Sequence, residues 1–161
     1  MKPEYPIEVV DLFITEQCNL NCSYCFHPKT AAVMTVEEGK KIIDRLKELY
    51  PNKMGLTFFG GEPTLYPETV LTLAEYAIPL WDRCFLTLVT NGTYFDEKFF
   101  NRLKELNFTV QVSMDGDEET HSKYRGGDFK QTCENAINIL KIFPTASVRM
   151  TYTPENVSML S

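Results

Sequence analysis

Three cysteines lie close together in the sequence, at Cys18, Cys22 and Cys25. Thiols at this spacing can converge on one metal centre from a single loop, because the chain between them can wrap around the centre. An iron–sulfur cluster normally takes four cysteine thiolates, so three cysteines would leave one iron without a protein side chain. An open coordination position is typical of a reactive metal site, whereas a structural site is closed. The spacing therefore favours a reactive iron–sulfur cluster.

Two other interpretations of this loop stay open at the level of the residues. His27 follows Cys25 closely and would complete a closed site of three cysteines and one histidine around zinc. The paired ligand spacing of ordinary zinc modules is missing, and a lone histidine near cysteines is more often a bystander than a ligand. The three thiols can equally be free or redox-active. The remaining cysteines, Cys84 and Cys133, stand among apolar residues and are expected to be small core residues.

The elements that must position such a site alternate between strand and helix. Runs of β-branched and apolar residues predict five strands, at residues 7–14, 56–59, 85–89, 108–113 and 146–152. Apolar residues at helical spacing and helix-starting residues predict four helices, at residues 36–50, 67–78, 96–106 and 129–140. Thr35 and Glu38 predict a capping box at the start of the first helix. The segment between the fourth strand and the last helix is expected to be a long loop that holds His121 and Arg125.

Strands that alternate with helices imply a parallel sheet with right-handed crossovers, which is an α/β fold. Each predicted strand is followed at its carboxyl end by a glycine, cysteine, asparagine, aspartate or threonine. In parallel α/β folds, ligands bind at these ends, where loops, free backbone groups and helix N-termini converge. The candidate chemistry is therefore expected to gather at one rim of the sheet.

Two segments at this rim carry a resemblance to a known family. The Cys-x3-Cys-x2-Cys loop, with the aromatic Tyr24 just before its third cysteine, resembles the signature loop of radical S-adenosylmethionine (radical SAM) enzymes. The segment Gly60–Pro63, which reads Gly-Gly-Glu-Pro after the second strand, resembles the second motif of that family. The resemblance extends over residues 7–153 and implies a partial (β/α) TIM-like barrel with about five βα units.

The resemblance also implies what these residues bind. The three cysteines would hold a [4Fe–4S] cluster. The residues implied to bind SAM are Tyr24, Gly60, Gly61, Glu62, Asn91, Ser113 and Arg125. In this arrangement Tyr24 lies near the adenine, and Glu62 with its two preceding glycines meets the amino group. Asn91 is the candidate partner of the ribose hydroxyls, and Ser113 also contacts SAM. Arg125 forms a fork to the SAM carboxylate.

The segment after the fourth strand narrows the resemblance to a subgroup. The strand ends in Ser-x-Asp-Gly at residues 113–116, and His-x3-Arg follows at residues 121–125. This pattern resembles anaerobic sulfatase maturases and other SPASM-type peptide-modifying enzymes. The resemblance then implies reductive cleavage of SAM to a 5′-deoxyadenosyl radical, which abstracts hydrogen from a peptide or protein substrate, with electrons from a flavodoxin- or ferredoxin-like donor. The alternatives are a radical SAM reaction on a small molecule or nucleoside, and a zinc-stabilised non-catalytic α/β binding module.

Length, charge and composition limit the remaining possibilities. The 161 residues fit one domain, and the net charge of −6 argues against a nucleic-acid partner, which needs clustered Lys and Arg. No apolar run approaches the ~20 residues of a membrane span, and the polar N-terminus does not resemble a signal peptide, so we expect a cytoplasmic protein with no membrane partner. A radical SAM core usually has more βα units than the sequence predicts. Residues 1–161 are therefore expected to be the N-terminal portion of a core domain whose C-terminal part is absent.

Overall fold

Five parallel strands form one sheet in the computed structural model, which describes residues 9–154 and 156–157. The strands are β1 (Val9–Thr15), β2 (Lys53–Gly60), β3 (Arg83–Thr90), β4 (Phe108–Ser113) and β5 (Ser147–Arg149). Their order in the sheet is their order in the sequence, and every neighbouring pair is parallel. A sheet that always adds the next strand on the same side has the arrangement of a partial barrel and not of a doubly wound sheet. The predicted α/β fold is confirmed.

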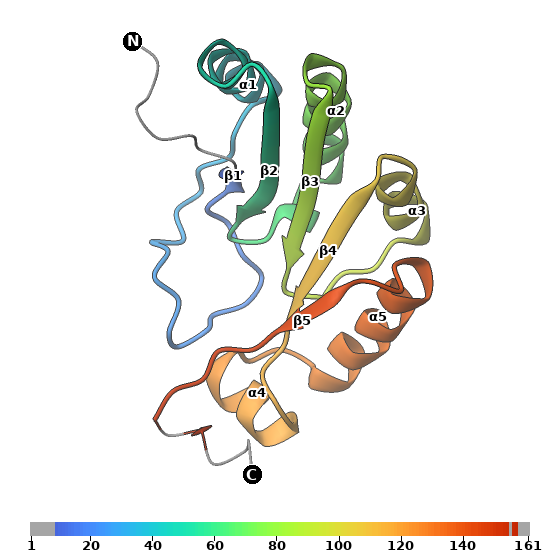
Figure 1. Cartoon of the computed structure of the whole chain (residues 1–161). Helices are drawn as coiled ribbons and strands as arrows, with labels where there is room; N and C mark the ends of the chain where they lie inside the picture. Colours follow the sequence, from blue (N-terminus) through green and yellow to red (C-terminus); the bar gives the residue numbers. More distant parts are fainter. Residues whose placement is uncertain (1–8, 155, 158–161) are drawn as a thin grey trace.

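Helices fill the connections between the strands. They are α1 (Val36–Leu49), α2 (Pro67–Ala77), α3 (Glu97–Glu105), α4 (Glu118–Tyr124) and α5 (Phe129–Ile142), with short 3-10 turns η1 (Pro63–Leu65) and η2 (Ile78–Leu80). Helices α1, α2, α3 and α5 follow one another along one face of the sheet, whereas α4 lies beyond the carboxyl end of β4 (Figure 1). No helix in the described part of the chain has the length and apolarity to cross a membrane.

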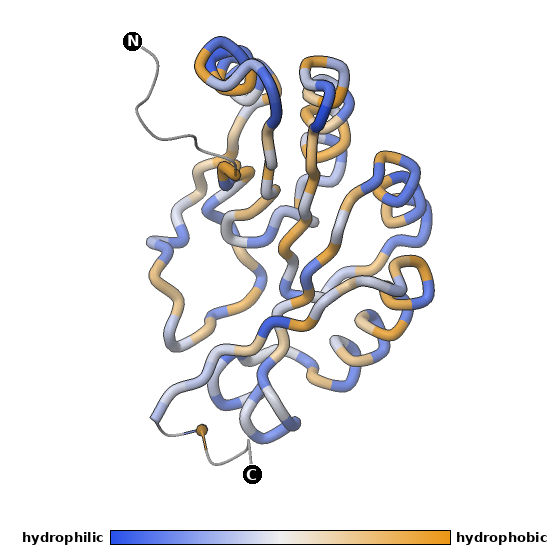
Figure 2. The backbone as a smooth tube through the Cα atoms, in the orientation of Figure 1, coloured by the Kyte–Doolittle hydropathy of each residue, from blue (hydrophilic) through white to orange (hydrophobic). Residues whose placement is uncertain are grey.

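The hydrophobic core lies between the sheet and the helices that cover it. Alternate strand residues face this core, and Leu12, Ile14, Phe58 and Leu88 are all fully buried there. The helices carry both apolar and polar residues within their turns (Figure 2). The other face of the sheet is open in places, and Phe85 on β3 is 61% exposed. This one-sided burial follows from the period of two along a strand.

The ends of the elements differ in places from the prediction. The predicted capping box is present, since Glu38 N donates to Thr35 Oγ1 at 3.2 Å and Thr35 N donates to Glu38 Oε2 at 2.9 Å. Residues 7 and 8 of the predicted first strand lie outside the described residues. The predicted strand at 146–152 is shorter, because the pairing of β5 with β4 extends only from Ser147 to Arg149.

The prediction of a long loop after β4 is wrong for residues 118–124, which form α4. The side chain of Asp117 caps this helix by accepting a hydrogen bond from Thr120 N at 2.9 Å. Glu118 and Glu119 occupy its first turn, where the helix dipole favours negative charge. The helix has only about two turns, which is too short for a helical period to be recognised in the sequence.

The two isolated cysteines are only partly buried, so the expectation that both belong to the core is met in part. Cys84 packs against the core, and burial raises the pKa of its thiol to about 11. Cys133 lies within α5, with its Sγ 3.9 Å from Met114 Sδ.

Candidate cofactor site

The carboxyl ends of the strands surround a cavity of about 640 Å³. All of the site residues predicted from the sequence line it, namely Cys18, Cys22, Tyr24, Cys25, Gly60, Gly61, Glu62, Asn91, Ser113 and Arg125. They come from the loop after β1, from the ends of β2, β3 and β4, and from the end of α4. The parallel sheet therefore gathers side chains that are far apart in the sequence, as its topology predicts.

The loop that carries the cysteines leaves β1 and returns to the end of the same strand. Met34 N donates to Ile14 O at 2.8 Å, and Thr15 Oγ1 donates to Ala32 O at 2.9 Å. These bonds close the base of the loop, so residues 16–31 form a single loop beyond the end of β1. Its three cysteines carry free, partly exposed thiols.

These thiols suit an iron–sulfur cluster better than a zinc ion. Three thiols without a fourth protein ligand are the donor set of a cluster that leaves one iron open. Zinc needs all of its ligands within about 2.3 Å of one point, whereas in a cluster each thiolate binds its own iron. The ring of His27 packs instead against Phe13, Phe26 and Phe59, with centroid separations of 4.8, 4.2 and 5.8 Å. The donor set therefore fits a cluster bound by three cysteines.

Two of the three cysteine sulfurs, those of Cys18 and Cys22, also interact with other residues of the chain. Leu20 N donates to Cys18 Sγ at 3.4 Å, and Asn91 Nδ2 donates to the same sulfur at 3.7 Å. These two bonds hold the Cys18 sulfur toward the end of β3. Burial raises the pKa of Cys22, and the positive charge of Arg125 opposes this increase.

The two glycines at the end of β2 allow it to approach the base of the cysteine loop. Gly61 N donates to Thr15 O at 2.7 Å, and Glu62 N donates to Gln17 O at 2.9 Å. A Cβ on Gly60 would lie 2.3 Å from Thr15 O, and one on Gly61 would lie 2.1 Å from Gln17 O. The packing of the chain alone therefore requires glycine at both positions. Their predicted contact with SAM stays a prediction.

Glu62 is fully buried and ties the ends of β2 and β3 together. Its Oε1 accepts hydrogen bonds from Thr64 N, Thr64 Oγ1 and Thr90 Oγ1 at 3.1, 2.7 and 2.8 Å, and its Oε2 accepts one from Asn91 N at 2.6 Å. Burial raises the pKa of Glu62, and these donors counteract the increase. The structure thus gives Glu62 a role in holding the rim, and its predicted bond to the SAM amino group stays a prediction.

Asn91 and Ser113 occupy the ends of β3 and β4. The Nδ2 of Asn91 donates to Asn19 Oδ1 at 2.8 Å, and its Oδ1 accepts from Thr93 N at 2.9 Å. Asn91 therefore faces the cysteine loop, and its contact with the ribose stays a prediction. Ser113 is half-buried in the wall of the cavity, where its contact with SAM is also still a prediction.

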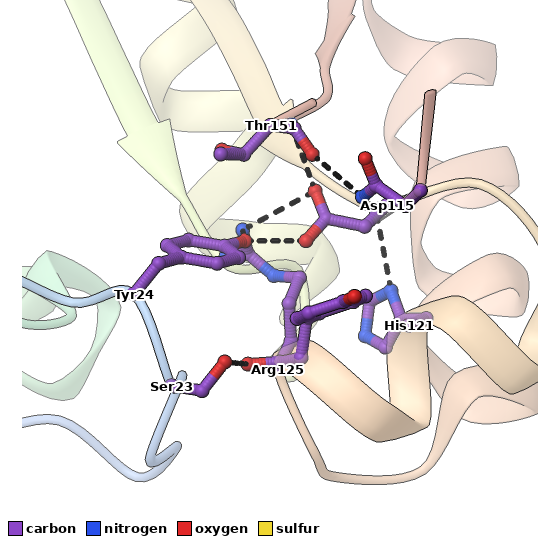
Figure 3. A network of polar contacts seen from close by, with 8 residues as sticks. Ser23, Tyr24, Asp115, His121, Arg125 and Thr151 are labelled. Carbon is purple, nitrogen blue, oxygen red and sulfur yellow. Dashed lines mark hydrogen bonds and ion pairs between the residues drawn. The ribbon is translucent and has the colours of Figure 1, made fainter. Parts of the chain in front are cut away.

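Tyr24 and Arg125, which lie about a hundred residues apart in the sequence, meet at the wall of the cavity (Figure 3). The Nη1 of Arg125 donates to the Tyr24 hydroxyl at 2.8 Å, and this hydroxyl in turn donates to Asp115 Oδ2. Burial, followed by the bond to Asp115, raises the pKa of Tyr24 to about 12, so the phenol is neutral near pH 7. The guanidinium of Arg125 also lies 3.9 Å from the Asp115 carboxylate.

One donor of Arg125 is unused. The residue is only 8% exposed, and its buried Nε–H has no hydrogen-bond partner in the part of the chain that the structure describes. The same is true of the buried Nε2 atoms of His27 and His121, so the missing partner does not by itself mark a ligand site. A guanidinium at the wall of a cavity suits a carboxylate, which it can bind through two parallel hydrogen bonds. The position of Arg125 in the cavity wall supports its predicted role.

The sequence did not reveal the roles of three residues in this network. Asp115 belongs to the Ser-x-Asp-Gly pattern, but nothing in the pattern shows that its carboxylate is buried between Tyr24 and Thr151. Thr151 N donates to Asp115 Oδ1 at 3.0 Å. His121 is fully buried, with its Nδ1 accepting from Asp115 N at 3.3 Å and its ring 5.3 Å from that of Phe129. His121 therefore supports the end of β4.

Comparison with known proteins identifies the family. The family model described as the Radical SAM superfamily matches residues 12–160. The chain belongs to the radical SAM superfamily. Members of this family are enzymes that use a [4Fe–4S] cluster and SAM, and the partial barrel agrees with their fold.

Relatives within the radical SAM superfamily have different named activities. Fe-coproporphyrin III synthase from Methanosarcina barkeri is 32% identical over 97% of this chain and 39% of its own length. The cysteine-type anaerobic sulfatase-maturating enzyme from Clostridium novyi is 30% identical over 89% of this chain and 43% of its own. The chain thus spans less than half the length of these radical SAM relatives.

Solved structures of anSMEcpe superpose closely on this radical SAM chain. The form with bound AdoMet (SAM) has a TM-score of 0.82 at 27% identity, covering 96% of this chain and 47% of that one. A further form holds both AdoMet and the Cp18Cys peptide, with a TM-score of 0.78 at 28% identity over 95% of this chain and 45% of that one.

Proposed function

We propose that this chain forms the cluster- and SAM-binding part of a radical SAM enzyme that modifies a peptide or protein side chain. The observation that carries the proposal is the cavity at the strand ends, which is lined by three free cysteines and a buried arginine. A bound cluster and SAM would together supply a 5′-deoxyadenosyl radical for hydrogen abstraction.

The residues of the chain have separate tasks in this proposal. Cys18, Cys22 and Cys25 hold the cluster from one loop. Arg125 binds the SAM carboxylate, and Tyr24 lies beside the adenine. Glu62 and the glycines before it keep the end of β2 against the cysteine loop and receive the SAM amino group, while Asn91 and Ser113 contact the rest of SAM.

The preference for a peptide substrate rests on two similarities. The pattern at residues 113–125 resembles the peptide-modifying subgroup, and the sulfatase-maturating relative and the peptide-bound anSMEcpe structure match the chain over most of its length. A small-molecule substrate is the second candidate, because the relative named Fe-coproporphyrin III synthase is equally similar. A flavodoxin- or ferredoxin-like protein is the proposed electron donor. The net charge of −6 supports the absence of a nucleic-acid partner, and the proposed location is cytoplasmic.

The test is electron paramagnetic resonance of the anaerobically reconstituted, dithionite-reduced chain, with and without SAM. We expect a reduced-cluster signal that changes when SAM is added, because SAM reaches the iron that has no cysteine. Cys18→Ala, Cys22→Ala and Cys25→Ala should each abolish this signal, whereas Cys84→Ala is the matched control and should keep it. Stoichiometric zinc without iron or sulfide in the same samples would refute the proposal.

A further inference from the structure

We propose that Asp115 is a positioning residue, which holds Tyr24 against the cysteine loop and keeps Arg125 extended into the cavity wall. The inference rests on the proposed function, because it assigns Asp115 to the binding of SAM through two other side chains. Neither the motifs nor the family resemblance gives Asp115 a task.

The Asp115 carboxylate joins several segments of the chain at one buried point (Figure 3). It is 0% exposed at the end of β4. Its Oδ2 accepts from the Tyr24 hydroxyl of the cysteine loop, and its Oδ1 accepts from Thr151 N beyond β5 at 3.0 Å. Arg125, at the end of α4, contributes the facing positive charge at 3.9 Å. A carboxylate buried in this way is satisfied only while these partners remain in place.

The interposed Tyr24 decides where the guanidinium of Arg125 lies. Arg125 donates to the Tyr24 hydroxyl at 2.8 Å and does not hydrogen-bond Asp115 directly, although the two are only 3.9 Å apart. Without the hydroxyl, attraction between the two buried charges would draw Arg125 onto Asp115 in a direct ion pair. Its donors would then turn away from the cavity. The Tyr24–Asp115 bond therefore keeps Arg125 available to a ligand carboxylate.

The same bond fixes the cysteine loop. Tyr24 stands between Cys22 and Cys25, and its neighbour Ser23 donates from its backbone N to Tyr124 O at 2.7 Å. The loop is thus attached to the end of α4 by a backbone bond and to the end of β4 by the Tyr24 hydroxyl. Asp115 itself is held from behind, since its N donates to His121 Nδ1 at 3.3 Å. The Asp115 carboxylate therefore holds the cysteine loop in a fixed position relative to β4.

The experiment compares Asp115→Asn, Tyr24→Phe and the double variant with the wild-type chain. The Asp115→Asn side chain has one acceptor oxygen in place of two, so it cannot accept from both Tyr24 and Thr151 at their present positions. The control is Asp44→Asn, which alters an equivalent bond on the surface, where Tyr76 Oη donates to Asp44 Oδ1 at 2.6 Å. Affinity for SAM is measured by equilibrium dialysis on the reconstituted protein, beside iron content and thermal unfolding.

We expect Asp115→Asn and Tyr24→Phe each to weaken SAM binding at least about tenfold, with Asp44→Asn unchanged. The double variant should bind SAM no more weakly than the weaker-binding single variant, because both changes break the same Tyr24–Asp115 hydrogen bond. This non-additivity is a result that a general loss of stability would not produce. Wild-type affinity in Asp115→Asn, or additive losses in the double variant, would overturn the inference.

If the wild-type chain binds no SAM, the proposed function is refuted, but the positioning role of Asp115 is not. A second measurement tests that role without SAM. In the metal-free chain, hydrogen exchange of the backbone amides at residues 18–29 should be faster in Asp115→Asn and in Tyr24→Phe than in wild type and Asp44→Asn. Equal exchange in all four proteins would show that Asp115 does not position the loop. The exchange comparison also serves if a variant assembles too little cluster for binding studies.

Discussion

At the scale of single residues, burial decides which groups of the site are free to bind a ligand. Glu62 and Asp115 are both 0% exposed, and their carboxylate oxygens accept hydrogen bonds from the chain itself. Arg125 is almost as buried but keeps one donor without a partner among the described residues. Both carboxylates therefore hold the framework of the site, and in the proposed function Glu62 and Arg125 also contact SAM.

Arg125→Ala should leave the cluster in place and weaken SAM binding. Removing one partner of a buried charged pair costs about 2–5 kcal/mol, or at least ~30-fold in affinity. Iron and sulfide analysis checks the cluster, and equilibrium dialysis checks SAM binding. Arg102→Ala is the control, because Arg102 pairs with Glu75 and Glu105 on the exposed surface. Unchanged SAM affinity in Arg125→Ala would show that another group binds the carboxylate.

Cys84 should react far more slowly than an ordinary cysteine. Burial raises the pKa of its thiol from 9.0 to about 11, so at pH 9 it carries roughly one-fiftieth of the thiolate of the unfolded chain. Because the folded thiol holds its proton up to a higher pH, Cys84 also contributes stability that is lost as the pH rises from about 9 to 11.

Iodoacetamide labelling followed by peptide mass spectrometry measures this difference. The same chain in urea provides the reference, and Cys84 should become as reactive there as the other thiols. Rapid labelling of Cys84 in the folded protein at pH 9 would contradict the assigned burial.

At the scale of elements, the sequence predicted the helices and strands that have a repeated apolar pattern. It missed features that depend on a single contact. The strands and the four long helices follow from their apolar periods, and the capping box of Thr35 and Glu38 marked the start of α1 correctly. α4 was missed because it is short and begins only with the cap of Asp117. β5 was predicted too long, since only its pairing with β4 limits it.

The same distinction applies to the candidate site. The positions of the cysteines, of Gly60 and Gly61, and of Arg125 at one rim could be predicted, because the topology of a parallel sheet places strand ends together. The hydrogen-bond network of Asp115 could not, because it depends on side-chain orientation across segments that are far apart in the sequence.

Gly61→Ala should separate the end of β2 from the cysteine loop. The added Cβ would lie 2.1 Å from Gln17 O, a backbone atom that cannot move without opening the loop. We expect a loss of about 3 kcal/mol in the free energy of unfolding, together with poor cluster assembly. Urea unfolding and iron content measure the two effects.

Gly126→Ala is the control for this prediction. A Cβ there meets nothing within 4 Å, although the φ of +73° is strained for alanine, so the cost should be only about 1 kcal/mol. If Gly61→Ala is no less stable than Gly126→Ala, the close approach of β2 to the loop is not needed.

At the scale of the whole molecule, the strand ends, the cysteine loop and α4 are separate segments that come together around the cavity. Ser23 joins the loop to α4, Glu62 joins β2 to β3, and Asp115 joins the loop to β4. A ligand that contacts several of these segments at once should therefore stabilise the whole fold and not only its own contacts.

The unfolding temperature should consequently rise with SAM only when the cluster is present. A ligand at 100 times its dissociation constant adds about 2.7 kcal/mol to the free energy of unfolding, which for a chain of this size corresponds to roughly 5–10 °C. Differential scanning calorimetry under anaerobic conditions measures the shift. The chelator-treated chain and Cys22→Ala should show none, because without the cluster SAM loses the iron that anchors it. An equal shift in the metal-free chain would mean that SAM binds to the protein groups alone, and the cysteines would then have a purpose other than presenting an iron to SAM.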